Sequence, residues 1–149
     1  MRIFAVIFGI ALIVILDTCA LILTAMDGVP VAPARFTFAM ARHAVVDLAQ
    51  VLSTTPKNGV NRLSSTEFTR LQDMLAVSGL RLKEGTALEQ KLAELRATYE
   101  PFVSALAHRM QVVLPPWIPP GDTLDDWQTS AWDEMFPCIR QTLNQVMHP

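Results

Sequence analysis

The chain has 149 residues, enough for one domain of ordinary size, and 51% of them are apolar, which excludes an intrinsically disordered protein. Lys and Arg number 12 and Asp and Glu 14, so the net charge of −2 argues against a nucleic-acid-binding protein, which needs a basic surface. The two cysteines, Cys19 and Cys138, are too few for a disulfide framework and lack the spacing of a metal site.

The N-terminal segment is a nearly unbroken apolar run from Ile3 to Met26. As a helix it would span roughly 36 Å, enough to cross a bilayer. Its Ile, Leu, Val and Phe residues favour insertion by about 7 kcal/mol, whereas Asp17 near the centre costs about 3 kcal/mol. The sum favours a membrane, so a spanning helix or signal anchor is one interpretation of residues 1–26.

Two other interpretations of this segment stay open. A cleaved signal peptide fits the basic start at Arg2 and the small residues around Cys19. A buried helix of a soluble core also fits, although a helix that is apolar nearly all round is unusual there. Because Arg35 and Arg42 follow the run, the charges favour a cytoplasmic side for the domain predicted over residues 34–149.

Beyond a Pro-containing loop at 28–34, the chain is predicted to be helical. Apolar residues recur every three or four positions over 34–52, which indicates an amphipathic helix. The next helix is predicted to begin at Ser64, which forms a capping box with Glu67, and to end at Gly79, a residue suited to a left-handed cap.

A longer apolar face over residues 88–113 predicts a further helix. Thr86 and Glu89 have the spacing of a second capping box at its start. Pro101 lies inside this pattern and removes one helical hydrogen bond, so we expect a kink or a break near Tyr99.

The last part of the chain is predicted to be extended and then helical. Four prolines hold residues 114–120 extended, and a final helix is expected from Asp122 or Thr123 to about Met135. No segment alternates with the period of a strand. The expected fold class is therefore all-α: a small helical bundle with a long apolar N-terminal helix, either membrane-spanning or buried.

Asp17 needs a cation or several hydrogen-bond donors if it is buried in this bundle. If the first two helices pack antiparallel, Asp17 lies level with Arg42 and His43, which follow the connecting loop by a similar distance. We therefore predict a buried polar pair between Asp17 and Arg42 or His43. A locally satisfied or water-facing Asp17 is the alternative.

Few side chains are spaced for catalysis or metal binding. His43 and Asp47 lie one helical turn apart, but no third metal ligand accompanies them. Glu100, Ser104 and His108 share one helix face, where parallel side chains do not converge on a substrate, and no Gly-rich loop accompanies them. We therefore expect a non-enzymatic protein with no catalytic residue, no cofactor and no metal.

Three tryptophans are candidates for an interaction surface, because tryptophan anchors many protein interfaces. Trp127 and Trp132 lie between acidic residues, and Trp117 lies in the Pro-rich segment. The alternative is that these rings cover the end of the bundle. The apolar face of residues 88–113 is a second candidate surface for assembly.

Five stretches of the chain, in this order, resemble the C-terminal cytosolic region of bacterial potassium-channel-family proteins, whose pore consists of two membrane helices. The resemblance implies a cytosolic helical domain that assembles subunits or regulates gating, and it favours a buried helix for residues 15–26. The stretches are ILDTCALIL (15–23), RFTFAMARHAVVDLAQVL (35–52), ELRATYEPFVSALA (94–107), LPPWIPP (114–120) and DDWQTSAW (125–132).

The chain departs from that family in what it lacks. It contains nothing like a TVGYG selectivity filter and at most one spanning helix, so we expect it to conduct no ions by itself. Residues 1–13 are apolar apart from Arg2, which also differs from the family. The resemblance therefore implies a regulatory domain at the bacterial inner membrane, acting as a homo-oligomer or with channel subunits. The alternative is a single-pass envelope protein, unrelated to channels, whose helical domain lies outside the cytoplasm.

Overall fold

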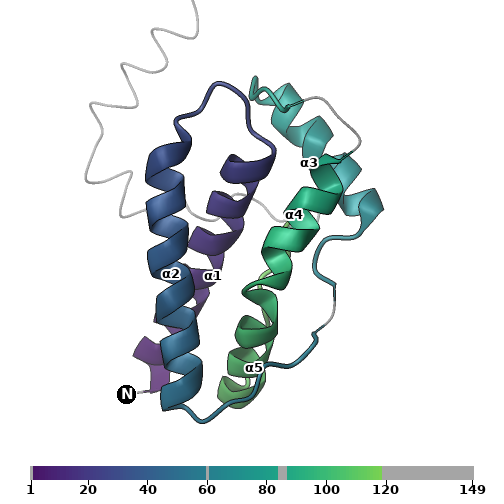
Figure 1. The fold of residues 1–149 in the computed structure, drawn as a ribbon. Helices are drawn as coiled ribbons and strands as arrows, with labels where there is room; N and C mark the ends of the chain where they lie inside the picture. The colour runs from purple at the N-terminus through teal and green to yellow at the C-terminus, as the bar shows by residue number, and fades with distance from the viewer. Residues whose placement is uncertain (1, 60, 84–86, 119–149) are drawn as a thin grey trace, which may run out of the picture. The chain divides into compact units, whose positions relative to one another are not determined.

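A computed structural model describes residues 2–59, 61–83 and 87–118 of the chain. These residues contain no strand, only one isolated antiparallel bridge between Met26 and Leu82. The predicted all-α bundle with a long apolar N-terminal helix is confirmed, and the final helix expected from residue 122 lies outside the described residues. The helices (Figure 1) are α1 (Arg2–Thr24), α2 (Val31–Val51), α3 (Ser65–Val77), α4 (Leu88–Ala97) and α5 (Glu100–Met110).

The core lies between α1, α2 and the consecutive helices α4 and α5. α1 and α2 run antiparallel and pack along their length, α1 also contacts α4 and α5, and α2 contacts α5 (Figure 1). The chain up to Ile118 forms one compact unit, so α1 belongs to the same bundle as the described part of the domain predicted over 34–149. The largest fully buried side chains come from each of these elements: Leu16, Val45, Leu92, Tyr99 and Val103.

α3 begins and ends where its sequence predicts. The Ser64 hydroxyl accepts a hydrogen bond from the Glu67 backbone N–H at 3.3 Å, and the Glu67 carboxylate accepts one from the Ser64 N–H at 2.7 Å. The capping box is therefore confirmed. Gly79 follows the helix with a φ of +76°, as expected for a left-handed cap.

The break predicted near Tyr99 is also confirmed. α4 ends at Ala97 and α5 begins at Glu100, with Pro101 in the first turn, where a helix does not need the missing N–H. The break lies inside the bundle, because Tyr99 is fully buried, at 0% exposure. It places two polar residues, Tyr99 and Glu100, opposite the middle of α1.

The start of α2 differs from the prediction. α2 begins at Val31, before the predicted start at residue 34, because Pro33 falls in the first turn, where the proline ring is tolerated. Pro30 is the N-cap residue and gives no side-chain hydrogen bond. The loop expected over 28–34 is therefore shorter than predicted.

The capping box predicted for α4 pairs Glu89 with a residue outside the described part of the chain. α4 begins at Leu88 with Ala87 as its N-cap, whose side chain makes no cap hydrogen bond. Glu89 accepts a hydrogen bond from the Ser65 hydroxyl at 2.6 Å, which ties α4 to the first turn of α3. Thr86 lies outside the described residues.

Candidate functional site

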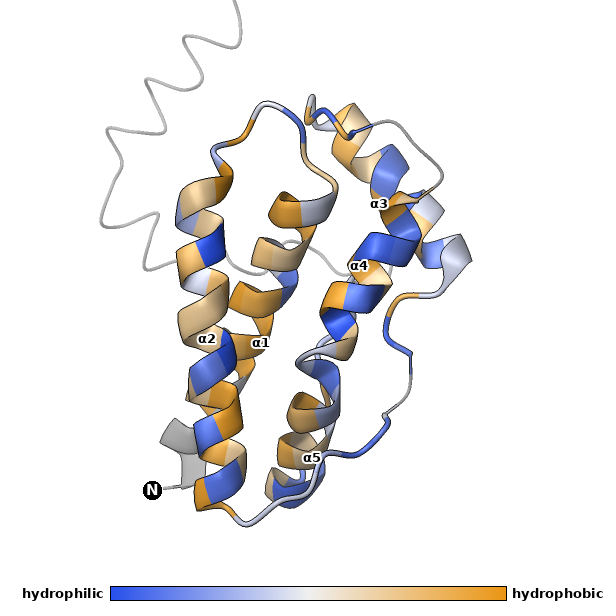
Figure 2. Ribbon diagram, viewed as in Figure 1, coloured by the Kyte–Doolittle hydropathy of each residue, from blue (hydrophilic) through white to orange (hydrophobic). Residues whose placement is uncertain are grey.

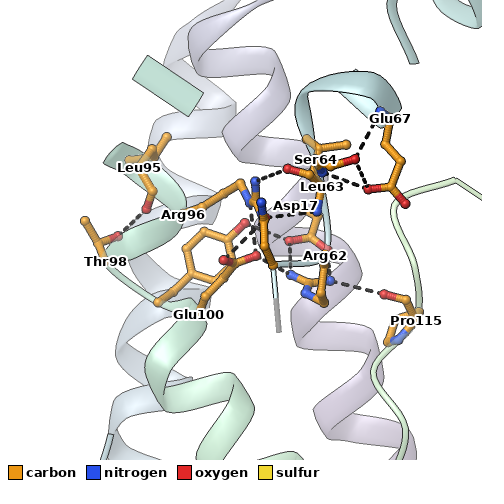
Figure 3. A network of polar contacts seen from close by, with 12 residues as sticks. Asp17, Arg62, Leu63, Ser64, Glu67, Leu95, Arg96, Thr98, Glu100 and Pro115 are labelled. Carbon is orange, nitrogen blue, oxygen red and sulfur yellow. Dashed lines mark hydrogen bonds and ion pairs between the residues drawn. The ribbon is translucent and has the colours of Figure 1, made fainter. Parts of the chain in front are cut away.

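Asp17, from the middle of the apolar helix α1, is the centre of a polar network (Figure 3). Arg62 binds its carboxylate through two parallel hydrogen bonds, Nη1 to Oδ2 and Nη2 to Oδ1, each 2.8 Å long. The Tyr99 hydroxyl donates a third, 2.7 Å long, to Oδ1. A bidentate guanidinium and a phenol therefore give the buried carboxylate the partners that burial requires.

The network continues from Arg62 to Glu100 and Arg96. Arg62 Nη2 lies 3.1 Å from Glu100 Oε1, and Arg96 donates to the same carboxylate from Nε at 3.0 Å. Arg96 also donates from Nη2 to the Asn61 side-chain oxygen at 2.9 Å. Two cations thus alternate with two anions, so the cluster is neutral and its charged groups are satisfied by one another.

The network joins segments that are distant in the sequence. Asp17 comes from α1, Arg62 from the loop before α3, Arg96 from α4, and Tyr99 and Glu100 from the junction of α4 and α5. Arg62 Nη1 additionally donates to the carbonyl oxygen of Pro115, 3.2 Å away, in the segment after α5. This arrangement fastens α1 to most of the bundle at a single point.

The surroundings change the proton affinity of two of these groups. Burial alone would lower the pKa of Arg62, but the hydrogen bonds and charge of Asp17, with that of Glu100, outweigh it and raise the pKa. Burial is also the main reason why the pKa of Tyr99 is raised well above its usual value, and the neighbouring Asp17 carboxylate adds to the effect. Arg62 therefore stays charged and Tyr99 stays protonated throughout the physiological pH range.

The predicted partner of Asp17 is wrong. Its cation is Arg62 and not Arg42 or His43. Arg42 is half-buried and donates its Nε–H to the carbonyl oxygen of Thr98 at 3.2 Å, while His43 is exposed. The Arg42 guanidinium is thus directed to the Thr98 carbonyl and His43 lies at the surface, whereas the Asp17 carboxylate faces Arg62 and Tyr99.

The other constellations considered for chemistry do not come together. His43 and Asp47 are both exposed, and the described residues contain no group of three or more His, Cys, Asp or Glu that could hold a metal ion. Glu100 is engaged by Arg62 and Arg96, and among the described residues no hydrogen bond links it to Ser104 or His108.

The candidate interaction surfaces are also revised. The Trp117 ring packs on the core, with the Arg96 guanidinium 5.5 Å from its centre and its indole N–H buried, so it is not a free surface anchor. Trp127 and Trp132 lie outside the described residues. Most of the apolar face of residues 88–113 is buried or half-buried in the bundle, with Val113 the exception at 89% exposure.

Exposed apolar side chains lie on α1 and also on α2, where Phe36 is 75% and Met40 71% exposed. Among the described residues one helix segment, Ile7–Thr24, is long and apolar enough to cross a membrane, with a mean hydropathy of 2.5, a property shared with signal sequences and core helices. Figure 2 shows α1 as mostly hydrophobic, whereas α2 and α4 carry hydrophilic residues as well. Only 33% of the segment is buried in the bundle, which is low for a core helix.

The exposed residues of α1 fall on one side of the helix, opposite the core. We name this side the outer stripe, and at 100° per residue its members lie within about a third of the helix circumference. Ile7 is 59% exposed and Val14 50% exposed. The outer stripe consists of Ile7, Phe8, Ala11, Val14, Ile15 and Thr18.

In comparisons with protein-family models, curated proteins and solved structures, nothing matches this chain. The resemblance to the cytosolic region of potassium channels therefore stays a prediction from the sequence. The site is defined by geometry alone: a closed polar network that holds α1 in the bundle, and an apolar stripe on the outer side of the same helix.

Sequence reasoning missed four of the five network residues. Arg62 lies 45 residues from Asp17 along the chain and in a loop, where no periodicity indicates which way a side chain points. Tyr99 and Glu100 sit at the predicted break, and the available signal was that break itself. A helix interruption opposite a buried carboxylate is a place where polar side chains can turn inward.

Proposed function

We propose that the chain is a non-enzymatic helical module that binds the surface of a lipid membrane through the outer stripe of α1. The observation that carries this proposal is the exposure of large apolar side chains along one side of a helix whose other side is packed. Contiguous exposed apolar surface marks a binding site for a protein or a membrane. A helix whose other side is packed in a bundle can place such a stripe in the plane of the membrane interface.

The polar network supports binding at the surface over insertion. If α1 crossed the bilayer, it would leave the bundle, and Asp17 would lose Arg62 and Tyr99 as partners. The core would also lose Leu16 and Ala20, both at 0% exposure. A peripheral position keeps these contacts and covers only the stripe that is already exposed.

The expected affinity from the stripe alone is modest. Its four large side chains, Ile7, Phe8, Val14 and Ile15, are between 38% and 59% exposed. Covering each contributes about 1 kcal/mol, roughly half of the value for a fully exposed side chain, or about 4 kcal/mol together. A free energy of this size corresponds to a dissociation constant of about 1 mM, so binding is reversible and gains from further contacts.

The non-enzymatic part of the proposal rests on the state of the charged groups. Asp17, Glu100, Arg62 and Arg96 hold one another, which fits a structural fastening better than an acid–base site. The sequence resemblance adds a class of neighbour, the subunits of a bacterial ion channel at the inner membrane. That part of the proposal rests on the resemblance alone.

Flotation with phosphatidylcholine vesicles tests the membrane part of the proposal. We expect the full chain to float with the vesicles. The Ile7→Gln/Val14→Gln variant loses about 2 kcal/mol of apolar contact and should bind roughly 30-fold more weakly, with an unchanged helical circular dichroism signal. The matched control is Val77→Gln/Val113→Gln, which removes two apolar side chains away from α1 that are more exposed, at 91% and 89%, than Ile7 and Val14. We expect the control to float like the unmodified chain.

Two results would contradict the proposal. Equal losses in both variants would show that general surface hydrophobicity, and not the outer stripe, causes binding. A chain that does not float but sediments as a dimer, and is made monomeric by Ile7→Gln/Val14→Gln, would show that a second copy covers the stripe.

A further inference from the structure

A second surface feature adjoins the C-terminal end of α1. An open groove of about 720 Å³ lies between the last turn of α1, the first half of α2 and α4. We name it the basic groove. Its floor is apolar, formed by the buried side chains of Phe38 and Leu88 and the half-buried side chains of Leu23 and Leu95.

Cations dominate the polar lining of the basic groove. Arg35 from α2, Lys83 from the segment before α4 and Lys91 from α4 line it, and among the described residues a single carboxylate, from Glu94, opposes them. None of the three cations forms an ion pair with a described residue, in contrast to the saturated network around Asp17. The groove therefore offers positive charge beside an apolar surface.

The walls of the groove are fixed by contacts of their own. The Lys83 backbone N–H donates to the carbonyl oxygen of Ala25 at 2.7 Å, which holds the segment before α4 against the end of α1. The Phe38 ring packs edge-on against Tyr99, with 5.8 Å between ring centres. These contacts hold the Lys83 backbone and the Phe38 ring in place at the groove.

We propose that the basic groove binds the head group of an anionic phospholipid. The inference rests on the membrane-binding function proposed above and names the lipid that the surface selects. Cations around an apolar floor match a ligand that carries an anionic phosphodiester on an apolar glycerol ester. Leu23 and Thr24, which line the groove, lie in the last turn of α1, the helix that carries the outer stripe nearer its N-terminus.

The charge of the whole chain makes the proposal specific. The net charge is −2, so long-range electrostatics disfavour an anionic surface. A preference for anionic lipid must therefore arise from a local group of cations. Each cation near an anionic membrane surface strengthens binding about fivefold, so the groove adds enough to turn weak apolar binding into selective binding.

The experiment compares vesicles of phosphatidylcholine with vesicles of phosphatidylcholine and phosphatidylglycerol, using the full chain at low salt. We expect tighter binding to the anionic vesicles. We expect Arg35→Gln/Lys91→Gln to lose roughly 25-fold in affinity for them and nothing for the neutral ones. Both residues are exposed, so the fold should tolerate the change. The matched control is Arg70→Gln/Arg109→Gln, two exposed cations outside the groove.

The outcomes separate this inference from the membrane-binding function. Equal affinity for both vesicles, or equal losses in the groove variant and the control, overturns the groove proposal while flotation on neutral vesicles still stands. Binding to anionic vesicles alone, lost in the groove variant but not in the control, supports the groove and overturns the role of the outer stripe. Binding to neither vesicle overturns both.

Discussion

At the residue scale, the pairing of Asp17 with Arg62 explains how a carboxylate sits in the middle of an apolar helix. The side chains of Arg62 and Asp17 are 8% and 14% exposed, so removal of one leaves the other charged and largely desolvated. We expect Arg62→Met to lower the free energy of unfolding by about 3 kcal/mol, measured by urea denaturation with circular dichroism.

The matched control for this prediction is Arg42→Met. Arg42 is half-buried but makes a single hydrogen bond, to a backbone carbonyl, and no ion pair with a described residue. We expect it to cost about 1 kcal/mol or less. If Arg42→Met lowered the free energy of unfolding as much as Arg62→Met, the loss in Arg62→Met could not be attributed to the buried ion pair with Asp17.

Tyr99 gives a second prediction because it is the single tyrosine of the chain. Its pKa is raised in the folded protein, mainly by burial and then by Asp17, whereas the unfolded chain releases the phenol proton near pH 10. The contribution of Tyr99 to stability is therefore complete below about pH 10. Above it, the unfolded state binds fewer protons than the folded state, so stability falls by about 1.4 kcal/mol per pH unit.

Ultraviolet absorbance of the tyrosinate form measures this effect directly. We expect no tyrosinate in the folded protein at pH 11 and its appearance only on unfolding in alkaline urea. Tyr99→Phe removes the ionisable group, so its stability should decline less steeply over the same pH range. A normal tyrosinate titration in the folded chain would contradict the burial of this hydroxyl.

The sequence indicates that the Asp17 carboxylate requires a cationic partner, but not which residue is that partner. A carboxylate in an apolar run requires a cation, and this much follows from the desolvation cost. Arg42 and His43 follow the loop after the first helix by about the distance at which Asp17 precedes it, and the prediction used these residues for that reason. Arg62 lies in a loop, where the direction of a side chain depends on tertiary packing, so the actual partner could not be derived from local patterns.

At the element scale, helix boundaries are predictable where a side chain satisfies the backbone locally. Ser64, Glu67 and Gly79 delimit α3 in this way, and Pro101 separates α4 from α5. α2 starts without a capping hydrogen bond from its N-cap residue Pro30, so its first turn is held by packing instead. The start of α2 is the boundary that differs from the prediction.

The capping box of α3 gives a prediction at this scale. Ser64→Ala removes the acceptor for the Glu67 backbone N–H, and we expect a loss of about 1 kcal/mol in the free energy of unfolding. The hydrogen bonds from Ser64 also lower the pKa of Glu67. A carboxylate whose pKa is lower in the folded than in the unfolded state stabilises the fold at pH values above its unfolded pKa. The contribution of Glu67 is therefore present at neutral pH and is lost as the pH falls below about 4.

Denaturation at neutral and acidic pH checks both parts of this prediction. Ser65→Ala is the control, because its exposed hydroxyl bonds to Glu89 and not to the helix terminus. The difference between Ser64→Ala and the unmodified chain should shrink in acid. A difference that is independent of pH would mean that the Glu67 carboxylate takes no part in the cap.

At the scale of the whole molecule, α1 has two environments that suit its composition. In the bundle, its inner side covers the core, Asp17 meets Arg62, and the outer stripe is left for a membrane surface. In a bilayer, its apolar residues would gain about 7 kcal/mol and Asp17 would cost about 3 kcal/mol, a net gain of about 4 kcal/mol. α1 stays in the bundle if core packing and the polar network stabilise it there by more than this free-energy gain.

Extraction of membranes with alkaline carbonate tests which environment α1 occupies. We expect carbonate to release the unmodified chain, because a helix that lies on the surface is not anchored through the bilayer. Arg62→Met weakens the attachment of α1 to the bundle and should therefore raise the fraction that resists carbonate and needs detergent, whereas Arg42→Met should not. If the unmodified chain resists carbonate as fully as Arg62→Met, α1 spans the membrane, and the single-pass alternative replaces the peripheral module proposed here.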